Sequence, residues 1–443
     1  MKTAFKLLMA IILGATHIGC RKALPVDASN WSPPQSVSQS RDSLGSTFSL
    51  YKWNNSLLAL NGDAGNLTLY LLNKDENNWK EKVSGCSSSW ALLDADPTTN
   101  QVVICRGTKL GDKLDVTFLR GVVNEDGNIS IVSDKKWNGD KSDLFGRTGR
   151  NLTIYSSDKP AYPVYRKGIV EGSNICIPYS VRGEAYEGNV LVSREAPYAH
   201  GVFSSSDSGV SWQRKQLSNL EGRYVSICKT KAHWYYFMAS QNKNTLNCFS
   251  KEQQEDWGQP AIISKSVVMY TAAGEDDIVH LCWLDRRHEK TRLNPVYPNR
   301  ENYEVAYCNR TDSDSSWNKD VILSKGLLYA YSPSISVEGD KIVVAWAGVK
   351  NDKDGRNEWN PSDIYYVTSK DGGKAWTKPM KVTDGFKDGI TSGKPQVALH
   401  KGVIHLFYIQ GKLDFKNTGG AVKLNQPPWP IVYQQRQFPS TSP

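Results

Sequence analysis

The chain has 443 residues with a formal net charge of +9, and 39% of its residues are hydrophobic. This length allows two or three ordinary domains or one large repetitive domain, and the hydrophobic content is sufficient for a substantial core. The positive charge is scattered, without an arginine-rich helix or a basic run, which disfavours nucleic-acid binding and leaves a solvated surface or a preference for anionic glycans.

Residues 1–20 have the features of an export signal. Lysines precede the apolar run Leu7–Leu13, and small residues follow it up to Gly19. The apolar run is too short to cross a bilayer. Cys20 after Gly19 fits a bacterial lipoprotein signal, although His17 stands where that pattern has leucine. We expect a secreted or cell-surface protein, and whether Cys20 carries a lipid anchor stays open.

Residues 21–42 are rich in Pro, Ser and Gln and are predicted to form a flexible tether. After them one pattern recurs with a period of about 60 residues: a strand, a strongly apolar strand, a polar excursion, a third strand and a turn. The apolar strands are expected at Leu57–Leu60, Val102–Cys105, Ile175–Tyr179, Trp234–Ala239, Ile278–Leu284, Ile342–Trp346 and Val403–Ile409. The third strands are expected at Leu67–Leu72, Leu114–Leu119, His200–Ser204, Thr245–Phe249, Tyr303–Cys308, Ile364–Thr368 and Ile431–Gln434.

Short strands at this period, with scarcely any helical periodicity, favour an all-β propeller built of four-stranded blades. We expect residues 43–440 to form a single propeller domain, with seven blades favoured and six as the alternative. A pair of β-sandwiches would not require this period.

One turn sequence occurs twice in complete form, at residues 205–212 and 369–376, each time after a predicted third strand. In such a turn the aspartate accepts hydrogen bonds from backbone amides, the glycine supplies a positive φ, and the tryptophan packs back as a lid. The two copies therefore predict the same folding device in two units. Its residues are Ser205, Asp207, Gly209 and Trp212, and Ser369, Asp371, Gly373 and Trp376.

This turn resembles the Asp-box (BNR) hairpin of the sialidase superfamily, and a distant similarity to sialidases and trans-sialidases spans most of residues 45–410. The resemblance implies a propeller whose Asp boxes lie away from the catalytic face. The family hydrolyses or transfers terminal sialic acid. It uses three arginines on the carboxylate, a tyrosine nucleophile backed by glutamate, and an aspartate acid/base. Guanidinium groups suit this task because their fork matches a planar carboxylate.

Most of that catalytic set is missing from the sequence. The stretch Ser46–Leu50 lacks the arginine and the proline with which the family begins its first blade. Tyr331 matches the nucleophile, and Arg286, Arg287 and Arg300 are the candidates for the arginine set. Each of these residues also has a purely structural interpretation. Tyr331 would be an aromatic that packs at a blade junction, and the arginines would lie in a solvated or salt-bridged loop. The resemblance therefore implies an incomplete sialidase site.

Other polar residues are candidates for substrate contacts. Arg182 and Tyr186 lie on a predicted loop insertion, and His288 and Arg292 lie in the arginine-containing loop. A Tyr/His/Arg set can also perform lyase chemistry on uronate polymers, because arginine neutralises the carboxylate while tyrosine or histidine removes the α-proton. The longest excursions are expected on one face of the ring, at Arg182–Tyr198, Arg286–Asn302 and Gly348–Pro361.

The cysteines and histidines show no metal or redox spacing, so no metal and no cofactor is expected. Buried free thiols are common in strands, but an exported chain could pair Cys228 with Cys248 or Cys282 with Cys308. The favoured function is the binding of an extracellular glycan or glycoconjugate, with anionic glycans preferred. The alternatives are a divergent exo-glycosidase or sialidase that uses Tyr331, a polysaccharide lyase, and a protein-binding module.

Overall fold

The structure is a computed structural model, and all the elements that it describes are β-strands. Within the described residues, no helix has the length and the hydrophobicity needed to cross a bilayer. The described residues are 31–40, 47–53, 56–63, 66–73, 78–87, 90–96, 101–110, 113–123, 129–140, 152–156, 168–187, 190–193, 198–218, 224–240, 244–252, 255–287, 303–325, 327–350, 362–385, 389–414, 423–424 and 429–439.

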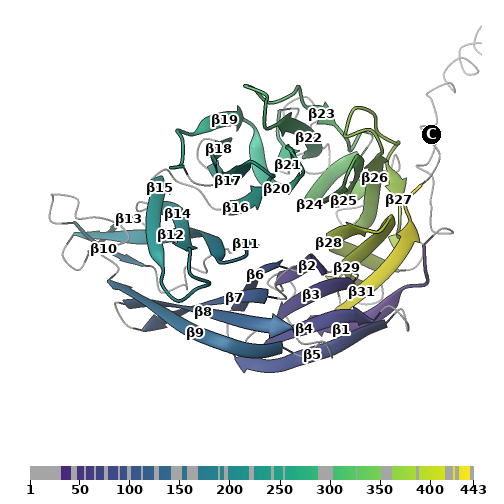
Figure 1. Ribbon diagram of the computed structural model, residues 1–443. Helices are drawn as coiled ribbons and strands as arrows, with labels where there is room; N and C mark the ends of the chain where they lie inside the picture. The colour runs from purple at the N-terminus through teal and green to yellow at the C-terminus, as the bar shows by residue number, and fades with distance from the viewer. Residues whose placement is uncertain are drawn as a thin grey trace, which may run out of the picture.

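The strands form seven sheets that follow one another around a ring (Figure 1). In five of the sheets, four successive antiparallel strands pair in chain order, which is the simplest antiparallel topology. The all-β propeller class is confirmed, whereas the number of blades of the whole chain stays a prediction. The five sheets are β2 (Thr47–Trp53), β3 (Ser56–Asp63), β4 (Asn66–Asn73) and β5 (Asn78–Ser87); β6 (Trp90–Asp96), β7 (Gln101–Leu110), β8 (Lys113–Val123) and β9 (Ile129–Asp140); β16 (Tyr224–Lys229), β17 (His233–Ser240), β18 (Thr245–Glu252) and β19 (Ala261–Ser264); β20 (Val267–Glu275), β21 (Ile278–Asp285), β22 (Glu304–Thr311) and β23 (Val321–Ile322); β24 (Leu327–Glu338), β25 (Lys341–Lys350), β26 (Asp363–Ser369) and β27 (Met380–Lys381).

The sheet that precedes β16 is larger because its second strand is longer than predicted. The prediction of a loop insertion at Arg182–Glu187 is wrong, since these residues continue the strand and pair with β10 and β13. A strand that extends beyond the other strands of its sheet can remain regular when further strands form hydrogen bonds with its exposed backbone amides and carbonyls. The members of this sheet are β10 (Leu152–Ser156), β11 (Ile169–Glu171), β12 (Asn174–Glu187), β13 (Val190–Ser193), β14 (Tyr198–Ser205) and β15 (Gln213–Ser218).

The last sheet joins the two ends of the chain. Its strands are β28 (Ile390–His400), β29 (Val403–Asp414), β30 (Lys423–Leu424) and β31 (Trp429–Gln437), and β1 (Gln35–Ser40) pairs with β31. The amide of Ser32 donates to the carbonyl of Gln435 at 2.8 Å, and Trp31 is only 6% exposed. The prediction of a tether is therefore wrong for residues 31–40. A polar segment can serve here because an outermost strand needs one bonded neighbour only.

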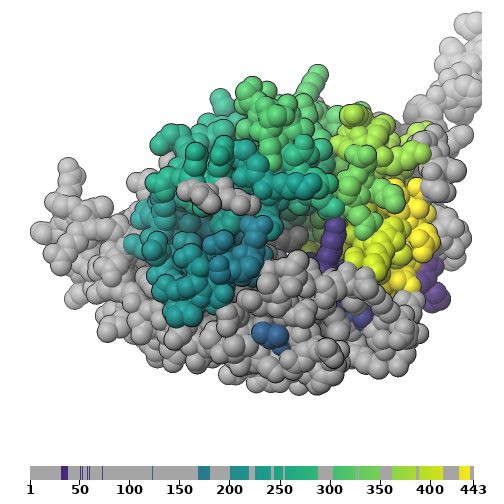
Figure 2. All heavy atoms as spheres, viewed as in Figure 1, coloured from purple at the N-terminus to yellow at the C-terminus, as the bar shows by residue number. Residues whose placement is uncertain are grey.

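The predicted apolar strands and third strands are all present, as the second and third strands of the seven sheets. Where their side chains are described, the second strands are largely buried on both faces, because each sheet is packed between two others. Ile342, Val343, Val344 and Ala345 on β25 are all fully buried. The core consists of apolar layers between neighbouring sheets. In the space-filling view, the coloured atoms from teal to yellow form one curved wall (Figure 2).

The innermost strand of a propeller sheet has one edge without a β-partner, and its amides need other acceptors. On β28 the amides of Val397 and Leu399 donate to the hydroxyls of Ser334 (3.1 Å) and Ser336 (2.8 Å) on β24. Farther along, the amide of Gly402 donates to Glu338 at 2.7 Å. Ser334, Ser336 and Glu338, which alternate along β24, thus accept hydrogen bonds from amides that have no β-partner on β28 and in the turn after it.

At the end of the ring where the innermost strands finish, a lysine spans the axis. The Lys52 ammonium on β2 donates to the Glu275 carboxylate on β20 (3.0 Å) and to the carbonyl of Val337 on β24 (2.6 Å). The β2–β5 and β20–β23 sheets are not neighbours in the ring (Figure 1). A second ion pair, between Lys229 and Glu171, lies at the ends of β16 and β11 (2.7 Å). We call this end of the ring the ion-pair end.

The turns at residues 205–212 and 369–376, which we call the first and second Asp turns, have the predicted local geometry. The amide of Ser211 donates to Asp207, and that of Ala375 donates to Asp371, both at 2.9 Å. The glycines Gly209 and Gly373 have φ of 84° and 91°. In each turn the indole nitrogen of the final tryptophan donates to the carbonyl of this glycine at 3.0 Å.

The disulfides considered for an exported chain are wrong, because the cysteines concerned are buried and free. Cys228 and Cys248 lie on strands either side of β17, about 10 Å apart, and a disulfide needs Cα atoms within about 7 Å. Cys308 pairs with Leu281, next to Cys282, so the two cysteines point to opposite faces of their sheet.

Candidate functional site

The end of the ring opposite the ion-pair end is where the innermost strands begin, the second strands end and the third strands begin. We call it the excursion end, because the long connections between second and third strands start there. The Asp turns follow third strands and lie toward the ion-pair end. The Asp turns therefore lie at the end of the ring away from the long connections.

Three successive innermost strands have a β-bulge close to the excursion end. The register shifts between Val267 and Tyr270 on β20, between Tyr331 and Ser334 on β24, and between Gly393 and Gln396 on β28. Bulges redirect side chains and are frequent beside active sites.

Two of these bulges contain a residue in the left-handed region. Ser332 has φ of 52° and Lys394 has φ of 50°, and a proline follows each of them. A left-handed residue other than glycine costs about 1–3 kcal/mol and is characteristic of functional sites. The bulges of β24 and β28 therefore point to the junction of these two sheets as a candidate site.

A row of three tyrosines crosses the start of β24. The ring centroids of Tyr303 and Tyr329 are 5.5 Å apart, and so are those of Tyr329 and Tyr331. All three are partly buried, and the amide of Ala330 donates to the carbonyl of Tyr303 at 3.1 Å. The Tyr331 ring lies over Gly393, where an added Cβ would be 3.7 Å from its hydroxyl oxygen. Partly exposed flat rings are thus collected beside the two bulges.

Hydroxyl groups and a buried carboxyl lie behind Tyr331. The Ser362 hydroxyl is 2.8 Å from the Thr391 hydroxyl and 2.7 Å from the carbonyl of Ser392, and it also hydrogen-bonds to Tyr331. Asp363 accepts from the Thr383 hydroxyl at 3.0 Å. The Ser362 hydroxyl therefore bridges the innermost strands of two neighbouring sheets.

Burial determines the protonation of two groups in this cluster. It raises the pKa of Tyr331 to about 12, so the phenol is neutral at physiological pH. Burial also raises the pKa of Asp363, although the amide of Gly385 and the nearby Lys381 act in the opposite direction. The Ser362 and Thr391 hydroxyls meet at β28, whereas Asp363, the next residue, has its partners Thr383 and Lys381 on the other face of the strand.

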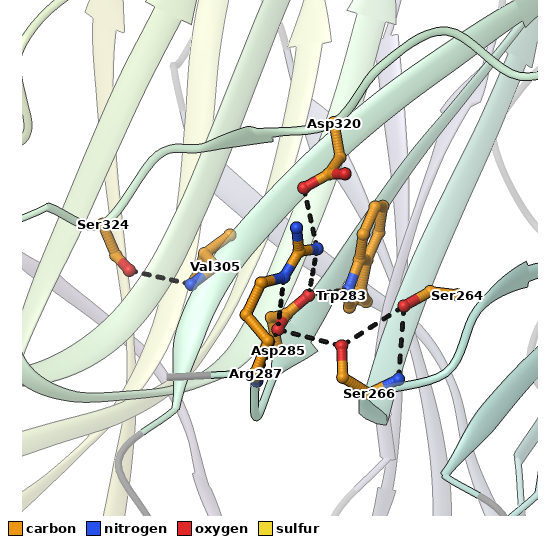
Figure 3. Close-up of polar contacts among 8 residues, drawn as sticks. All are labelled: Ser264, Ser266, Trp283, Asp285, Arg287, Val305, Asp320 and Ser324. Atoms are coloured by element: carbon orange, nitrogen blue, oxygen red, sulfur yellow. Dashed lines mark hydrogen bonds and ion pairs between the residues drawn. The ribbon is translucent and has the colours of Figure 1, made fainter. Parts of the chain in front are cut away.

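Arg287 is held by two carboxylates of its own sheet (Figure 3). Its guanidinium donates to Asp285 at 2.5 and 2.9 Å and is 2.7 Å from Asp320. Asp285 is 2% exposed and also accepts from Trp283 (2.8 Å) and Ser266 (2.9 Å). Burial of Asp285 opposes its ionisation, but the hydrogen bonds from Arg287 and Trp283 outweigh burial and lower its pKa. Hydrogen bonding to Asp285 in turn raises the pKa of Arg287.

These contacts disfavour the predicted role of Arg287 as a carboxylate-binding residue beside Tyr331. Its side chain lies against the β20–β23 sheet, as in the salt-bridged alternative. Arg286 donates to the side-chain oxygen of Asn244 at 3.2 Å, toward the preceding sheet. The catalytic assignments of Tyr331, Arg286 and Arg287 stay predictions.

The remaining predicted site residues are not located by side chain. Arg182 and Tyr186 lie on β12, where only the backbone is described. Outside the described residues lie Arg300, His288, Arg292 and Cys20. Most of the excursions Arg286–Asn302 and Gly348–Pro361 also lie outside them.

Sequence reasoning missed Ser362, Asp363 and Thr391. A signal was nevertheless available, because Tyr331-Ser332-Pro333 and Gly393-Lys394-Pro395 both interrupt an innermost strand in the same way. In the part of the chain that the structure describes, no group of three or more histidine, cysteine, aspartate or glutamate residues could hold a metal ion.

No family model matches the chain, and no curated protein matches it. Solved structures that resemble it include a sialidase from Trypanosoma rangeli, with 9% identity, a TM-score of 0.42, and coverage of 90% of this chain and 53% of that one. The α-L-arabinofuranosidase Arb93A from Fusarium graminearum has 10% identity, a TM-score of 0.43, and coverage of 92% and 98%. The intramolecular trans-sialidase from Ruminococcus gnavus has 11% identity, a TM-score of 0.42, and coverage of 91% and 96%. Likeness at this level carries no argument about a ligand or a reaction.

Proposed function

We propose that the protein is an exported propeller that binds an extracellular carbohydrate at its excursion end, without an intact sialidase catalytic set. The observation that carries the proposal is the cluster of Tyr303, Tyr329 and Tyr331 beside the Ser362 and Thr391 hydroxyls, at the bulged innermost strands of two sheets. Partly exposed aromatic faces beside a few fixed polar groups are what a carbohydrate requires, since a sugar has apolar C–H faces and a rim of hydroxyls.

The absence of a sialidase set is supported by two observations. Arg287 already forms ion pairs with Asp285 and Asp320, so its guanidinium group has carboxylate partners within the protein. Tyr331 has a pKa raised by burial and a serine as its hydrogen-bond partner, where a nucleophile needs a base.

The test is a glycan array followed by calorimetric titration of the ligands that bind. Tyr329→Ala and Tyr331→Ala should each weaken binding by tenfold or more, because truncation removes about 1.4 kcal/mol or more of ring contact. Trp257→Ala, a truncation of a partly buried aromatic in another sheet, is the matched control and should bind normally. Equal affinity of all three variants would reject the proposed site, and rapid turnover of a fluorogenic sialoside would reject the absence of a catalytic set.

A divergent glycosidase is the second candidate, and Asp363 is the observation that favours it. A buried carboxyl group with a raised pKa is the form that a general acid takes. Glycosidase activity predicts that nitrophenyl glycosides are hydrolysed and that Asp363→Asn abolishes turnover while ligand binding is retained.

A further inference from the structure

The described chain begins at the ion-pair end of the ring and is fixed there. β1 starts at this end because it runs antiparallel to β31, and β31 ends where the amide of Phe438 donates to the carbonyl of Gly402 at 2.8 Å. The amide of Ser32 donates to the carbonyl of Gln435 (2.8 Å), and the amide of Gln435 donates to the Ser32 hydroxyl (2.9 Å). The side-chain amide of Gln434 donates to the carbonyl of Ser32 at 2.8 Å. Three hydrogen bonds thus hold residue 32 beside the last residues of β31.

Trp31 adds an apolar contact at the same place. Its ring belongs to the layer between the β24–β27 and β28–β31 sheets, where it meets the Tyr366 ring edge-on at a centroid distance of 5.4 Å. The guanidinium carbon of Arg436 lies 5.7 Å from the centre of the same ring. The chain is therefore anchored to the ring from residue 31 onward, and the predicted tether is reduced to residues 21–30.

We propose that a lipid on Cys20 attaches the protein to a membrane with the ion-pair end of the ring toward the bilayer and the excursion end facing outward. Cys20 follows Gly19 directly after the apolar run Leu7–Leu13, as in a lipoprotein signal. The candidate functional site lies at the excursion end, so the same attachment presents it to the medium. This inference concerns the placement of the ring and does not depend on which ligand the site binds.

The attachment requires a thioether between Cys20 and a diacylglycerol phospholipid. The thiolate attacks the glycerol carbon that carries the phosphate, so that a C–S bond forms while the C–O bond to the phosphate breaks. The phosphate leaves with its head group and takes up the proton that the thiol has lost. Hydrolysis of the Gly19–Cys20 peptide bond then makes Cys20 the first residue. Two acyl chains hold a protein on a membrane stably, whereas one chain binds only reversibly.

The number of residues between Cys20 and Trp31 decides which end of the ring can face the bilayer. Eleven Cα-to-Cα steps span at most about 38 Å when fully extended, and about 18 Å on average in a flexible chain. The 12 residues of β24 run from the excursion end to the ion-pair end, a height of about 36 Å. To turn the excursion end toward the bilayer, the tether would have to run back along the whole ring at nearly full extension. With the ion-pair end toward the bilayer, no such extension is needed.

The first experiment tests the attachment. The full chain is expressed in a bacterium that is fed a fatty acid with a clickable tag, and the mature protein is analysed by mass spectrometry. The mature chain should begin at Cys20, carry the tag and remain with the membranes. Cys20→Ala should carry no tag, whereas Cys228→Ala, which removes a buried thiol of the ring, is the matched control and should be tagged like the parent. A mature chain with a free Cys20 thiol, or one that begins at another residue, would overturn the proposal.

The second experiment tests the orientation. Lys325 and Asp340 are exposed and flank β24, with Lys325 at the excursion end and Asp340 at the ion-pair end. The lipidated variants Lys325→Cys and Asp340→Cys are labelled with a thiol-reactive fluorophore and placed on phosphatidylcholine vesicles that contain a lipid with an energy acceptor on its head group. Energy transfer should be several-fold stronger from position 340 than from position 325, after subtraction of the signal of the labelled parent. Equal transfer, or stronger transfer from position 325, would overturn the orientation even if Cys20 carries a lipid.

Discussion

The first and second Asp turns share their backbone and indole hydrogen bonds but have different surroundings. At the first turn, a Cβ added to Gly209 would meet Trp212 of the turn at 3.4 Å and Ile175 of the same sheet at 3.6 Å. At the second turn, a Cβ added to Gly373 would lie 2.2 Å from the hydroxyl of Tyr307, which belongs to the neighbouring sheet. Among the residues whose side chains are described, the second turn contacts the preceding sheet, and the contacts of the first turn are with its own sheet.

The joint at the second turn has several contacts. The side-chain amide of Asn309 donates to the carbonyl of Gly372 at 2.9 Å, and the rings of Tyr307 and Trp376 are 4.7 Å apart. Asn309 and Tyr307 both lie on β22, the third strand of the preceding sheet. A change in the second turn should therefore destabilise the β20–β23 sheet as well as its own sheet.

The largest difference is expected from Gly→Ala changes. Gly373→Ala should lower the free energy of unfolding by about 3 kcal/mol, because a strained positive φ and an overpacked contact add together. Gly209→Ala should cost about 1 kcal/mol, from the backbone strain alone. Urea unfolding of the two variants measures both values. Equal losses would show that the contact with Tyr307 is not tight.

A smaller difference between the two glycine variants is expected in how acid affects their stability, and it should be specific to the second turn. Tyr307, which contacts that turn, also lies 2.8 Å from the Nδ1 atom of His280, and burial lowers the pKa of His280 to about 4. Because the unfolded chain binds the proton more tightly, stability should fall between pH 6.5 and about 4, by about 1.4 kcal/mol for each unit of pKa difference.

The measurement is the urea midpoint of Gly373→Ala, Gly209→Ala and the parent chain as the pH is lowered. Loosening the contact at Tyr307 should make His280 easier to protonate, so Gly373→Ala should lose less stability with acid than the parent. Gly209→Ala should follow the parent. His405 forms the same 2.8 Å contact with Tyr433 away from either turn, and it supplies the background titration common to all three proteins.

The smallest difference is expected from the aspartates. Asp207→Ala and Asp371→Ala should cost similar amounts, because both carboxylates accept the same backbone amide at the same distance. The extra bond that Asp207 accepts from the exposed Ser211 hydroxyl should add only a small further cost. Hydrogen bonds from Ser211 lower the pKa of Asp207 to about 2, so its stabilisation should be lost only as the pH falls from about 3.8 toward 2. A much larger loss for Asp371→Ala would mean that the carboxylate itself takes part in the joint.

Much of the fold could be predicted because each unit repeats a local pattern. Apolar second strands and alternating third strands are visible in any one unit, and the two Asp turns mark their ends. The strand β1 could not be recognised, because a polar outermost strand that needs one partner has the composition of a linker. The extension of β12 was hidden for a related reason, since its partners β10 and β13 lie in insertions outside the repeat.

The candidate site was predictable only in part. Tyr331 stood out as an aromatic at a blade junction, and Asp285 could be expected to pair with Arg287 because the two are near neighbours in the sequence. Asp320 and Thr391 could not be recognised, because each is a single polar residue that becomes a partner only when distant segments meet. Such contacts depend on how sheets are placed beside each other, which no local pattern encodes.

The pairing of Gln35 with Tyr433 makes the assembly of the ring a late event. A ribosome releases β1 about 400 residues before its partner β31. Until then β1 has no partner, and its Ser- and Gln-rich sequence is poorly suited to aggregation. The same seam should be where the assembled ring opens first under force or heat.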